Sequence, residues 1–409
     1  MNARRVAVTG MGIVSALGND VAGAFARLKR FENCVESLDD LKRYKGLRST
    51  LGSLAGWSRP AHWTRKTTRS MGTVAEYALA ATEQAIGDAG LDAATLESGM
   101  TGVAYGSCSG SIAAHLDLFS MFYSNEVNNI TSNTYIKLMP QTAACNLSVY
   151  FRTHGRLMPT GTACTSGSLA VGNAYELIKY GMQDVMIAGG AEEFSPTQVA
   201  VFDTLFATSL RNDAPKTTPR PYDVARDGLV IGEGAGTLIL EEYERAKARG
   251  AKIYGEVVGF CENTDGTHVT NPNAETMCAC IAKAVSESGV APEEIGFVSG
   301  HGTATKAGDI AETTATFKAF GGRAVPIASL KSYTGHTLGA CGAIEAIMTL
   351  KCMEAGWAHP TINLKEVDKD CAPLDYITGE GRSLNAQFAM SNNFAFGGVN
   401  TSLIFKKAD

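Results

Sequence analysis

Cysteine, histidine and lysine side chains lie in loops of small residues, where they could carry out covalent and acid–base chemistry. Cys164 stands in GTACTSG (161–167) at the expected start of a helix, and the partial positive charge of a helix N-terminus favours a thiolate. His301 and His336 each follow a strand-like run, and Lys331 shortly precedes His336. A single cysteine or histidine is more often structural, but together they predict a nucleophilic thiol that works with imidazoles.

Two further glycine-rich motifs carry weaker signals. GMGIVS (10–15) has a serine in place of the third glycine of a dinucleotide fingerprint, so we interpret it as a strand, 5–9, that runs into a glycine turn. GSCSG (106–110) has the spacing of a nucleophile elbow but lacks a strongly patterned helix after it, so Cys108 is expected to line a pocket. The cysteines and histidines lack the spacing of zinc ligands, and no metal site is expected.

The elements around these loops are those of an α/β protein. Short apolar runs alternate with helical patterns, which favours buried strands. Segment 75–91 aligns without gaps with 274–290, and each copy ends in a glycine that is followed by a strand. We therefore predict an internal duplication with halves 1–250 and 251–409. The expected strands are 6–10, 102–106, 184–190, 236–242, 296–300, 324–330 and 387–391.

Composition restricts the class of protein. The 409 residues carry a formal net charge of -5 with 19% charged residues, which disfavours a nucleic-acid partner or a disordered acidic tail. The 44 glycines lack a fixed period and indicate close backbone approaches and tight turns. Ten cysteines without a CxxC pair are typical of reduced thiols, and no apolar run is long enough for a membrane helix. We therefore expect a cytoplasmic protein without a membrane span.

Four ordered motifs carry a family resemblance that covers nearly the whole chain. They are TACTS around Cys164, HGTAT with the following Asp309 and Glu312, K..TGHTLGA.GA.E from Lys331 to Glu345, and NNFAFGGVN (392–400). Together they resemble the signatures of the β-ketoacyl-[acyl-carrier-protein] synthases of the Cys-His-His class. The resemblance implies the thiolase fold, in which two duplicated αβαβα halves form a five-layered structure.

The resemblance also implies a decarboxylative Claisen condensation. Cys164 would hold an acyl group as a thioester, while His301 and His336 would stabilise the enolate that forms when malonyl-acyl-carrier protein loses carbon dioxide. Lys331 would keep the histidines neutral, and an oxyanion hole would use the backbone N–H groups of Cys164 and Phe394. Other implied roles are the gate (Phe394, Phe396), contacts to the phosphopantetheine arm (Thr270, Thr303, Thr305) and structural support (Glu345, Asp309, Glu312).

The implied partner is an acyl carrier protein, whose phosphopantetheine carries the substrates, so no dissociable cofactor is expected. Arg65, Lys66 and Arg69 form a basic group that would either dock this partner or lie on a solvated helix face. The chain would form a homodimer, or a heterodimer with a chain-length-factor-like paralogue. Two other classes stay open, namely a noncatalytic partner subunit and a degradative thiolase.

Three departures from the family pattern bear on substrate choice. Ala395 replaces a glycine that is usual in the gate and should stiffen it. SCSG (107–110), with Cys108 and Ser109, stands where the family commonly has a larger aliphatic residue at the dimer-facing end of the acyl pocket, and would leave room for a longer or flatter chain. Phe206 stands where an arginine is frequent. These departures leave open whether the chain elongates fatty acids or polyketide and aryl-polyene-type products.

Overall fold

Eleven strands of the described chain form one continuous sheet. The computed structural model describes residues 3–128 and 130–408. The strand order is β12-β10-β9-β14-β15-β8-β1-β7-β6-β4-β5. The strands of this sheet are β1 (Val6–Ser15), β4 (Thr101–Gly106), β5 (Leu157–Thr160), β6 (Val185–Glu192), β7 (Gly234–Glu242), β8 (Gly255–Thr264), β9 (Ile295–Ser299), β10 (Pro326–Ala328), β12 (Asp375–Tyr376), β14 (Phe388–Ala395) and β15 (Val399–Lys407).

The sheet contains the same pattern twice, which confirms the predicted duplication. Outward from the centre, β1-β7-β6-β4-β5 in one half matches β8-β15-β14-β9-β10 in the other. The strand directions match too. In the first half β4 and β6 are parallel and β6 and β7 are antiparallel, and in the second half β9 and β14 are parallel and β14 and β15 are antiparallel. Helices α3 (Thr73–Ala89) and α11 (Ala274–Ser288) are the two copies found in the sequence, and both end at a left-handed glycine.

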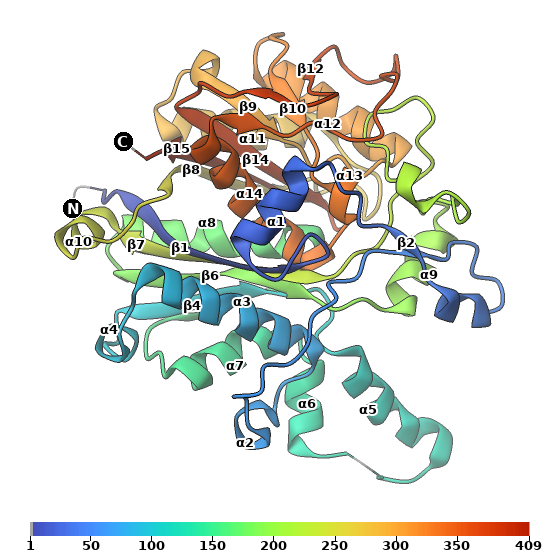
Figure 1. Cartoon of the computed structure of the whole chain (residues 1–409), viewed down its shortest axis with the longest axis vertical. Coiled ribbons are helices and arrows are strands. Elements are labelled where there is room, and N and C mark those ends of the chain that lie inside the picture. The colour runs from blue at the N-terminus through green and yellow to red at the C-terminus, as the bar shows by residue number, and fades with distance from the viewer. Residues whose placement is uncertain (1–2, 129, 409) are drawn as a thin grey trace.

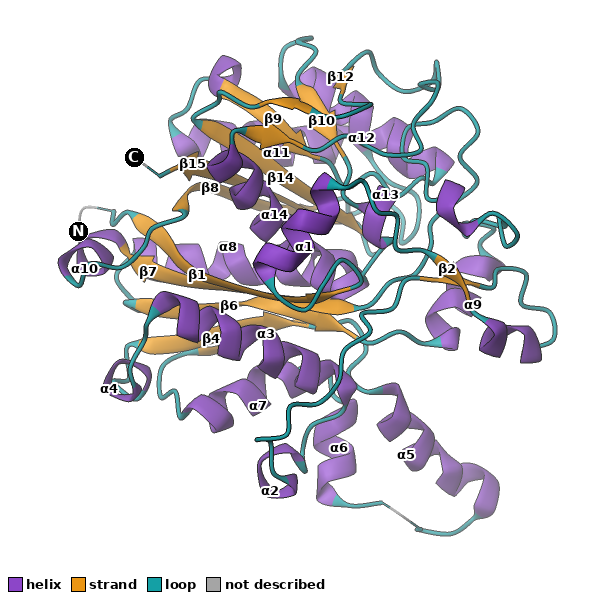
Figure 2. Ribbon diagram, in the orientation of Figure 1, coloured by secondary structure: helices purple, strands orange, loops and turns teal. Residues whose placement is uncertain are grey.

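Two helices are enclosed between the halves of the sheet. The halves join through only three residue pairs, Val6–Val8 of β1 with 255–257 of β8, so they can fold over one another. Helices α8 (Ser166–Lys179) and α14 (Cys341–Ala355) lie in the space between them (Figure 1), and their apolar side chains pack with strands of both halves. Helices α3 and α7 (Thr142–Phe151) cover one outer face, and α11 and α12 (Lys306–Ala319) cover the other (Figure 2). These five layers are the predicted thiolase-like arrangement.

The glycine turn that we predicted after residue 9 is wrong. β1 continues to Ser15 and pairs with β7 along its length. Gly10 and Gly12 allow a close approach, because a Cβ on Gly12 would lie 1.9 Å from the carbonyl oxygen of Ala81 in α3. The glycines therefore serve helix–sheet packing and not a bound dinucleotide.

A helix does follow GSCSG, contrary to our expectation. It is α5 (Ile112–Ser124), and with α6 (Ser132–Leu138) it projects from the body of the molecule (Figure 1). Its pattern was missed because its large apolar residues, including Leu116, Phe119 and Phe122, are exposed, so no single apolar stripe faces the core.

No helix within residues 3–128 and 130–408 is both long enough and apolar enough to cross a bilayer.

The close approach of β1 and α3 yields a stability prediction. Gly12→Ala should lower the free energy of unfolding by about 1–3 kcal/mol or more, because the added methyl group meets backbone atoms that cannot move aside. Gly87→Ala is the matched control, since Gly87 lies on α3 in open space and alanine there should stabilise the helix by up to about 1 kcal/mol. Urea unfolding of both variants tests this, and equal stabilities would contradict the packing role.

Candidate active site

The N-terminal ends of the two central helices bring the predicted catalytic residues together. Cys164 lies in a 3₁₀ turn, Ala163–Thr165, directly before α8. His336 lies in the corresponding loop before the 3₁₀ turn Leu338–Ala340 and α14. His301 follows the end of β9. The chain thus delivers each residue from a buried, rigid element.

The three side chains form one buried cluster. Nε2 of His336 lies 3.0 Å from Sγ of Cys164, and the rings of His301 and His336 meet edge to face with their centroids 5.1 Å apart. All three residues are at most 5% exposed. The expectation that these residues act together therefore agrees with the geometry.

The hydrogen bonds at Nδ1 determine which nitrogen of each histidine carries the proton. The backbone N–H of Leu338 donates to Nδ1 of His336 at 3.2 Å. The Lys331 ammonium lies 3.0 Å from Nδ1 of His301, and the side-chain amide of Asn393 lies 3.2 Å from the same atom. An ammonium and a backbone N–H can only donate, so Nδ1 accepts in both rings. The proton of each neutral ring is therefore on Nε2. Both Nε2–H groups are thus available as donors.

The charge of Lys331 is held by a buried carboxylate. Nζ of Lys331 lies 2.5 Å from Glu345, which also accepts from Asn393 at 2.6 Å. Burial opposes the charge on Lys331, but the carboxylate outweighs it and raises the pKa of the amine. Burial and the nearby ammonium lower the pKa of both imidazoles well below the ordinary value. The histidines are therefore neutral at physiological pH, as predicted.

Cys164 behaves differently from our first expectation. Burial raises the pKa of its thiol to about 11, although Lys331 and the backbone N–H groups of Phe396 and Cys164 act in the opposite direction. Desolvation thus outweighs the helix N-terminus in this site. The same contacts correct the predicted oxyanion hole, because the N–H groups beside the sulfur belong to Cys164 and Phe396, not Phe394. Phe394 instead presents its ring edge-on to His301, with centroids 6.3 Å apart.

Each catalytic loop contains a non-glycine residue in the left-handed region. Ala163 (φ 52°) precedes Cys164, Ala304 (φ 62°) follows His301, and Leu338 (φ 47°) follows His336. Such conformations persist only where the surroundings enforce them, and they concentrate at functional sites.

Buried carboxylates hold these loops in place. Glu312 accepts from the backbone N–H groups of His301 (2.5 Å) and Gly302 (2.7 Å), and Asp309 accepts from Ala304 (3.1 Å). The supporting roles predicted for Asp309 and Glu312 therefore agree with their contacts.

The sequence analysis missed two buried polar residues that support the site, Glu192 and Asn393. Glu192, at the end of β6, accepts from the N–H groups of Cys108 (2.7 Å) and Gly339 (3.2 Å). Asn393 links His301 to Glu345. A polar residue inside an otherwise buried strand was the available signal.

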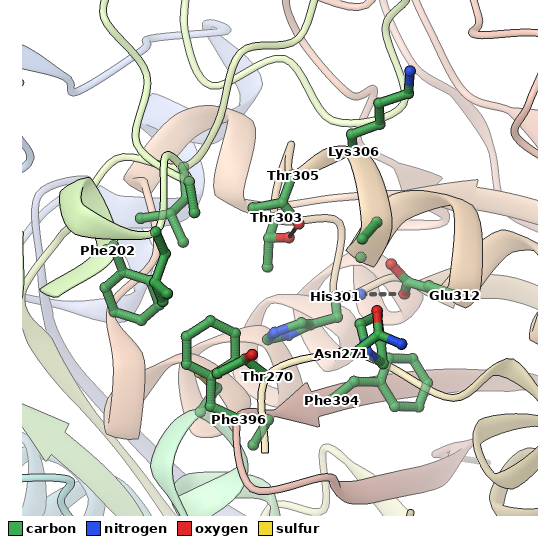
Figure 3. A pocket seen from close by; sticks show the side chains of 18 of the residues that line it. Phe202, Thr270, Asn271, His301, Thr303, Thr305, Lys306, Glu312, Phe394 and Phe396 are labelled. Atoms are coloured by element: carbon green, nitrogen blue, oxygen red, sulfur yellow. Dashed lines mark hydrogen bonds between the residues drawn. The ribbon is translucent and has the colours of Figure 1, made fainter. Parts of the chain in front are cut away.

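A cavity of about 510 Å³ leads to Cys164, His301 and His336. Thr270, Thr303 and Thr305 line it, as predicted for an arm-binding passage, and the hydroxyls of Thr303 and Thr305 are 2.9 Å apart. Figure 3 shows the ring of Phe396 next to that of Phe202 in the lining of the cavity, and their centroids are 5.1 Å apart. Ala395 ends β14 without left-handed strain, so the strand accommodates this departure.

The other predicted site residues lie outside this cavity. Cys108 packs against the apolar cluster that contains Cys164, but neither it nor Ser109 lines the cavity, so their role in an acyl pocket stays a prediction. Arg65 and Lys66 belong to the short helix α2 (Arg65–Thr68), and Arg69 follows it. All three are exposed.

Comparison with known proteins decides the family. Residues 3–246 match the β-ketoacyl synthase N-terminal domain, and residues 254–365 match its C-terminal domain. The chain belongs to the β-ketoacyl synthase family. This confirms the resemblance found in the four sequence motifs.

Relatives of this β-ketoacyl synthase share its full length. A 3-oxoacyl-[acyl-carrier-protein] synthase 2 of Vibrio cholerae is 38% identical, and the match covers 100% of both chains. A crystal structure of a β-ketoacyl synthase from Burkholderia phymatum is 51% identical with a TM-score of 0.97, covering 99% of this chain and 100% of the other. A type II polyketide ketosynthase, bound to a hexaketide and in complex with its acyl-carrier protein, is 30% identical with a TM-score of 0.90 and full coverage of both chains.

The lowered histidine pKa values yield a pH prediction. Removing the ammonium in Lys331→Met should raise the pKa of both imidazoles, so the acid limb of malonyl thioester decarboxylation should move to higher pH. The double variant Lys331→Met/Glu345→Gln avoids an unpaired buried carboxylate and should show the same direction. Carbon dioxide release between pH 5 and 8 measures this, with exposed Lys318→Met as the control. An unshifted limb in the folded double variant would contradict the role of Lys331.

Proposed function

We propose that this β-ketoacyl synthase joins an acyl group held on Cys164 to a malonyl unit presented by an acyl carrier protein, giving 3-oxoacyl-acyl-carrier protein and carbon dioxide. The observation that carries the proposal is one buried thiol beside two neutral imidazoles whose Nε2 atoms carry the protons, in a cavity that Cys164, His301 and His336 all line. The products would serve fatty acid or polyketide chain elongation.

The first step transfers the acyl group to Cys164. The sulfur attacks the thioester carbonyl, and the N–H groups of Cys164 and Phe396 stabilise the negative oxygen of the tetrahedral intermediate. The bond to the pantetheine sulfur then breaks, and the thiol proton leaves with the departing sulfur. Because Nε2 of His336 already carries a proton, this histidine acts as a donor here and not as the base.

The second step forms the new carbon–carbon bond. The malonyl carboxylate leaves as carbon dioxide, and its bonding electrons form an enolate whose oxygen accepts from His301 and His336. The enolate carbon attacks the acyl carbonyl on Cys164. The tetrahedral intermediate collapses, and the Cys164 thiolate leaves. The thiolate then takes up one proton from water, which restores the thiol, and no oxidant or reductant is needed.

Two features argue against the other classes. A noncatalytic partner subunit needs no nucleophile, whereas this chain keeps Cys164 among two histidines and Lys331. A degradative thiolase would lack the segment from Lys331 to His336 and would use coenzyme A directly. Condensation on a carrier protein is therefore the better supported activity.

The proposed reaction uses no resident metal and no dissociable cofactor. The ligand atoms of Cys164, His301 and His336 lie within 4.8 Å of one another, close enough for a soft metal ion. A metal needs an unprotonated Nε2, however, and the donors at both Nδ1 atoms keep the protons on Nε2. The nearby ammonium of Lys331 opposes a cation further.

Two partners belong to the proposal, together with a cytoplasmic location. An acyl carrier protein would deliver both substrates, steered by the exposed group Arg65, Lys66 and Arg69. A second chain of the same fold would cover the open edge at β5, where Leu157 is exposed, and the exposed apolar residues of α5. That second chain is another copy, or a chain-length-factor-like paralogue.

The nucleophile is tested by removing its sulfur. Cys164→Ala should abolish condensation and the acyl-enzyme adduct seen by intact-protein mass spectrometry. Malonyl decarboxylation should remain measurable, because His301 and His336 are still present. Cys145→Ala is the control and should retain both activities, since Cys145 lies away from the cavity on α7. Normal condensation by Cys164→Ala would contradict the mechanism.

The partner surface is tested by adding charge to it. Light scattering of the chain expressed alone should give the mass of two 43.1 kDa chains, and Leu116→Asp/Phe122→Asp should give the mass of one. The exposed Tyr180→Asp, at the C-terminal end of α8, should leave the mass unchanged. A single-chain mass for the unchanged protein that doubles with a paralogue would favour the heterodimer.

A further inference from the structure

An exposed apolar rim surrounds the mouth of the catalytic cavity. Leu205 and Phe206, just beyond α9 (Pro196–Thr204), line the cavity, and so does Val269. Phe206 is 79% exposed and Val269 69%. Isolated apolar side chains are common on surfaces, but these three share the entrance of a functional cavity.

The backbone of Phe206 is held in an unfavourable conformation. Its φ of 55° lies in the left-handed region, where the residue that ends a helix is usually glycine or asparagine. The N–H of Phe206 donates to Asp203 (3.0 Å), and that of Ala207 donates to Phe202 (3.0 Å). A bulky aromatic residue is thus kept both strained and exposed, a combination that indicates function more often than stability.

Arg48 fixes the ring in this position. Its guanidinium lies 4.4 Å from the ring centroid of Phe206 and donates to the side chain of Asp203 at 2.9 Å. The backbone N–H of Arg48 donates to the same carboxylate at 2.8 Å. Stacking on a guanidinium that is itself anchored leaves the aromatic ring little freedom to lose on binding.

We propose that Phe206, together with Leu205 and Val269, is a docking surface for an apolar side chain on the acyl carrier protein. The inference rests on the proposed function, because the arm of a carrier protein reaches Cys164 only when the protein body sits over this mouth. Aromatic and arginine side chains are enriched at protein interfaces, where a few residues carry most of the binding energy. The basic residues near α2 would then steer the carrier protein, while this rim selects it.

The same geometry specifies the chemistry of the contacting residue. The ring of Phe206 covers the face of the Arg48 guanidinium, and Asp203 satisfies part of its hydrogen-bonding edge. An acidic side chain placed against the ring would be desolvated without a direct partner, whereas an apolar one would bury the ring. The cognate carrier protein should therefore present an apolar residue, not a carboxylate, at this contact.

The test compares malonyl groups on a type II acyl carrier protein and on coenzyme A, which share the pantetheine arm. Phe206→Ala should lower kcat/KM for the carrier-bound substrate about tenfold more than for malonyl-coenzyme A, mainly through KM. Phe206→Arg should lower it at least as much. Tyr180→Ala is the matched control, because Tyr180 is also an exposed aromatic near a lysine but lies at the far end of α8.

Two outcomes would overturn the docking surface. Equal losses with both substrates would make Phe206 a cavity residue only, and a gain in Phe206→Arg would indicate an acidic partner. The affinity of the carrier protein, measured by calorimetry, should fall about tenfold in Phe206→Ala whether or not the enzyme turns over. If the unchanged protein turned over neither substrate, the proposed function would be wrong, but the docking surface would still be tested by the affinity measurement.

The stacking is tested with Arg48→Lys, which keeps the charge but not the planar group. Arg48→Lys and Phe206→Ala should each lower the affinity for the carrier protein. The two losses of binding free energy should be less than additive in the double variant, because both substitutions act through the same ring. Full additivity would contradict the role assigned to Arg48.

Discussion

The contact between the first turns of α8 and α14 is the constraint on which the site depends. A Cβ on Gly342 would lie 2.6 Å from the backbone nitrogen of Ser168, and one on Gly167 would lie 2.9 Å from that of Ala343. Only small residues allow two helices to begin this close together. Because Cys164 and His336 precede these turns, the contact brings thiol and imidazole to hydrogen-bonding distance. The duplication supplies the two helices, and the folded-over sheet holds them.

A buried ion pair makes this arrangement electrostatically useful. Lys331 and Glu345 are each 1% exposed, so desolvation of both must be offset by their contact and by Asn393. Replacing such a pair by apolar residues often costs a protein little stability. Here the ammonium occupies Nδ1 of His301 and lowers the pKa of both imidazoles, which leaves two neutral donors. Its retention is better explained by catalysis than by stability.

The sequence was informative where chemistry and local patterns coincide. Apolar runs predicted seven strands of the described sheet but not β5, β8, β12 or β15. The repeated helices predicted the two halves, and the motifs brought Cys164, His301 and His336 into one site. The errors arose where tertiary contacts decide. Gly12 belongs to a strand because α3 packs on it, and Phe396 supplies the oxyanion N–H because of how the turn after β14 is placed. Helix α5 was missed because its apolar residues face outward.

The strained loops and the buried carboxylates together keep the backbone of the site rigid. Ala163, Ala304 and Leu338 hold the backbone in conformations that would relax if nothing opposed them. Glu192, Asp309 and Glu312 bind backbone N–H groups in the loops around the site, and burial raises the pKa of these carboxyls to between about 6 and about 7. Burying each of these carboxylates costs desolvation free energy. Hydrogen bonds from a flexible loop would be too weak to offset that cost. A carboxylate buried without a full countercharge is tolerable only when its donors are fixed, and fixed donors keep the catalytic loops from relaxing. The rigidity of the site thus lies in its backbone, whereas the rim around Phe206 is exposed to solvent.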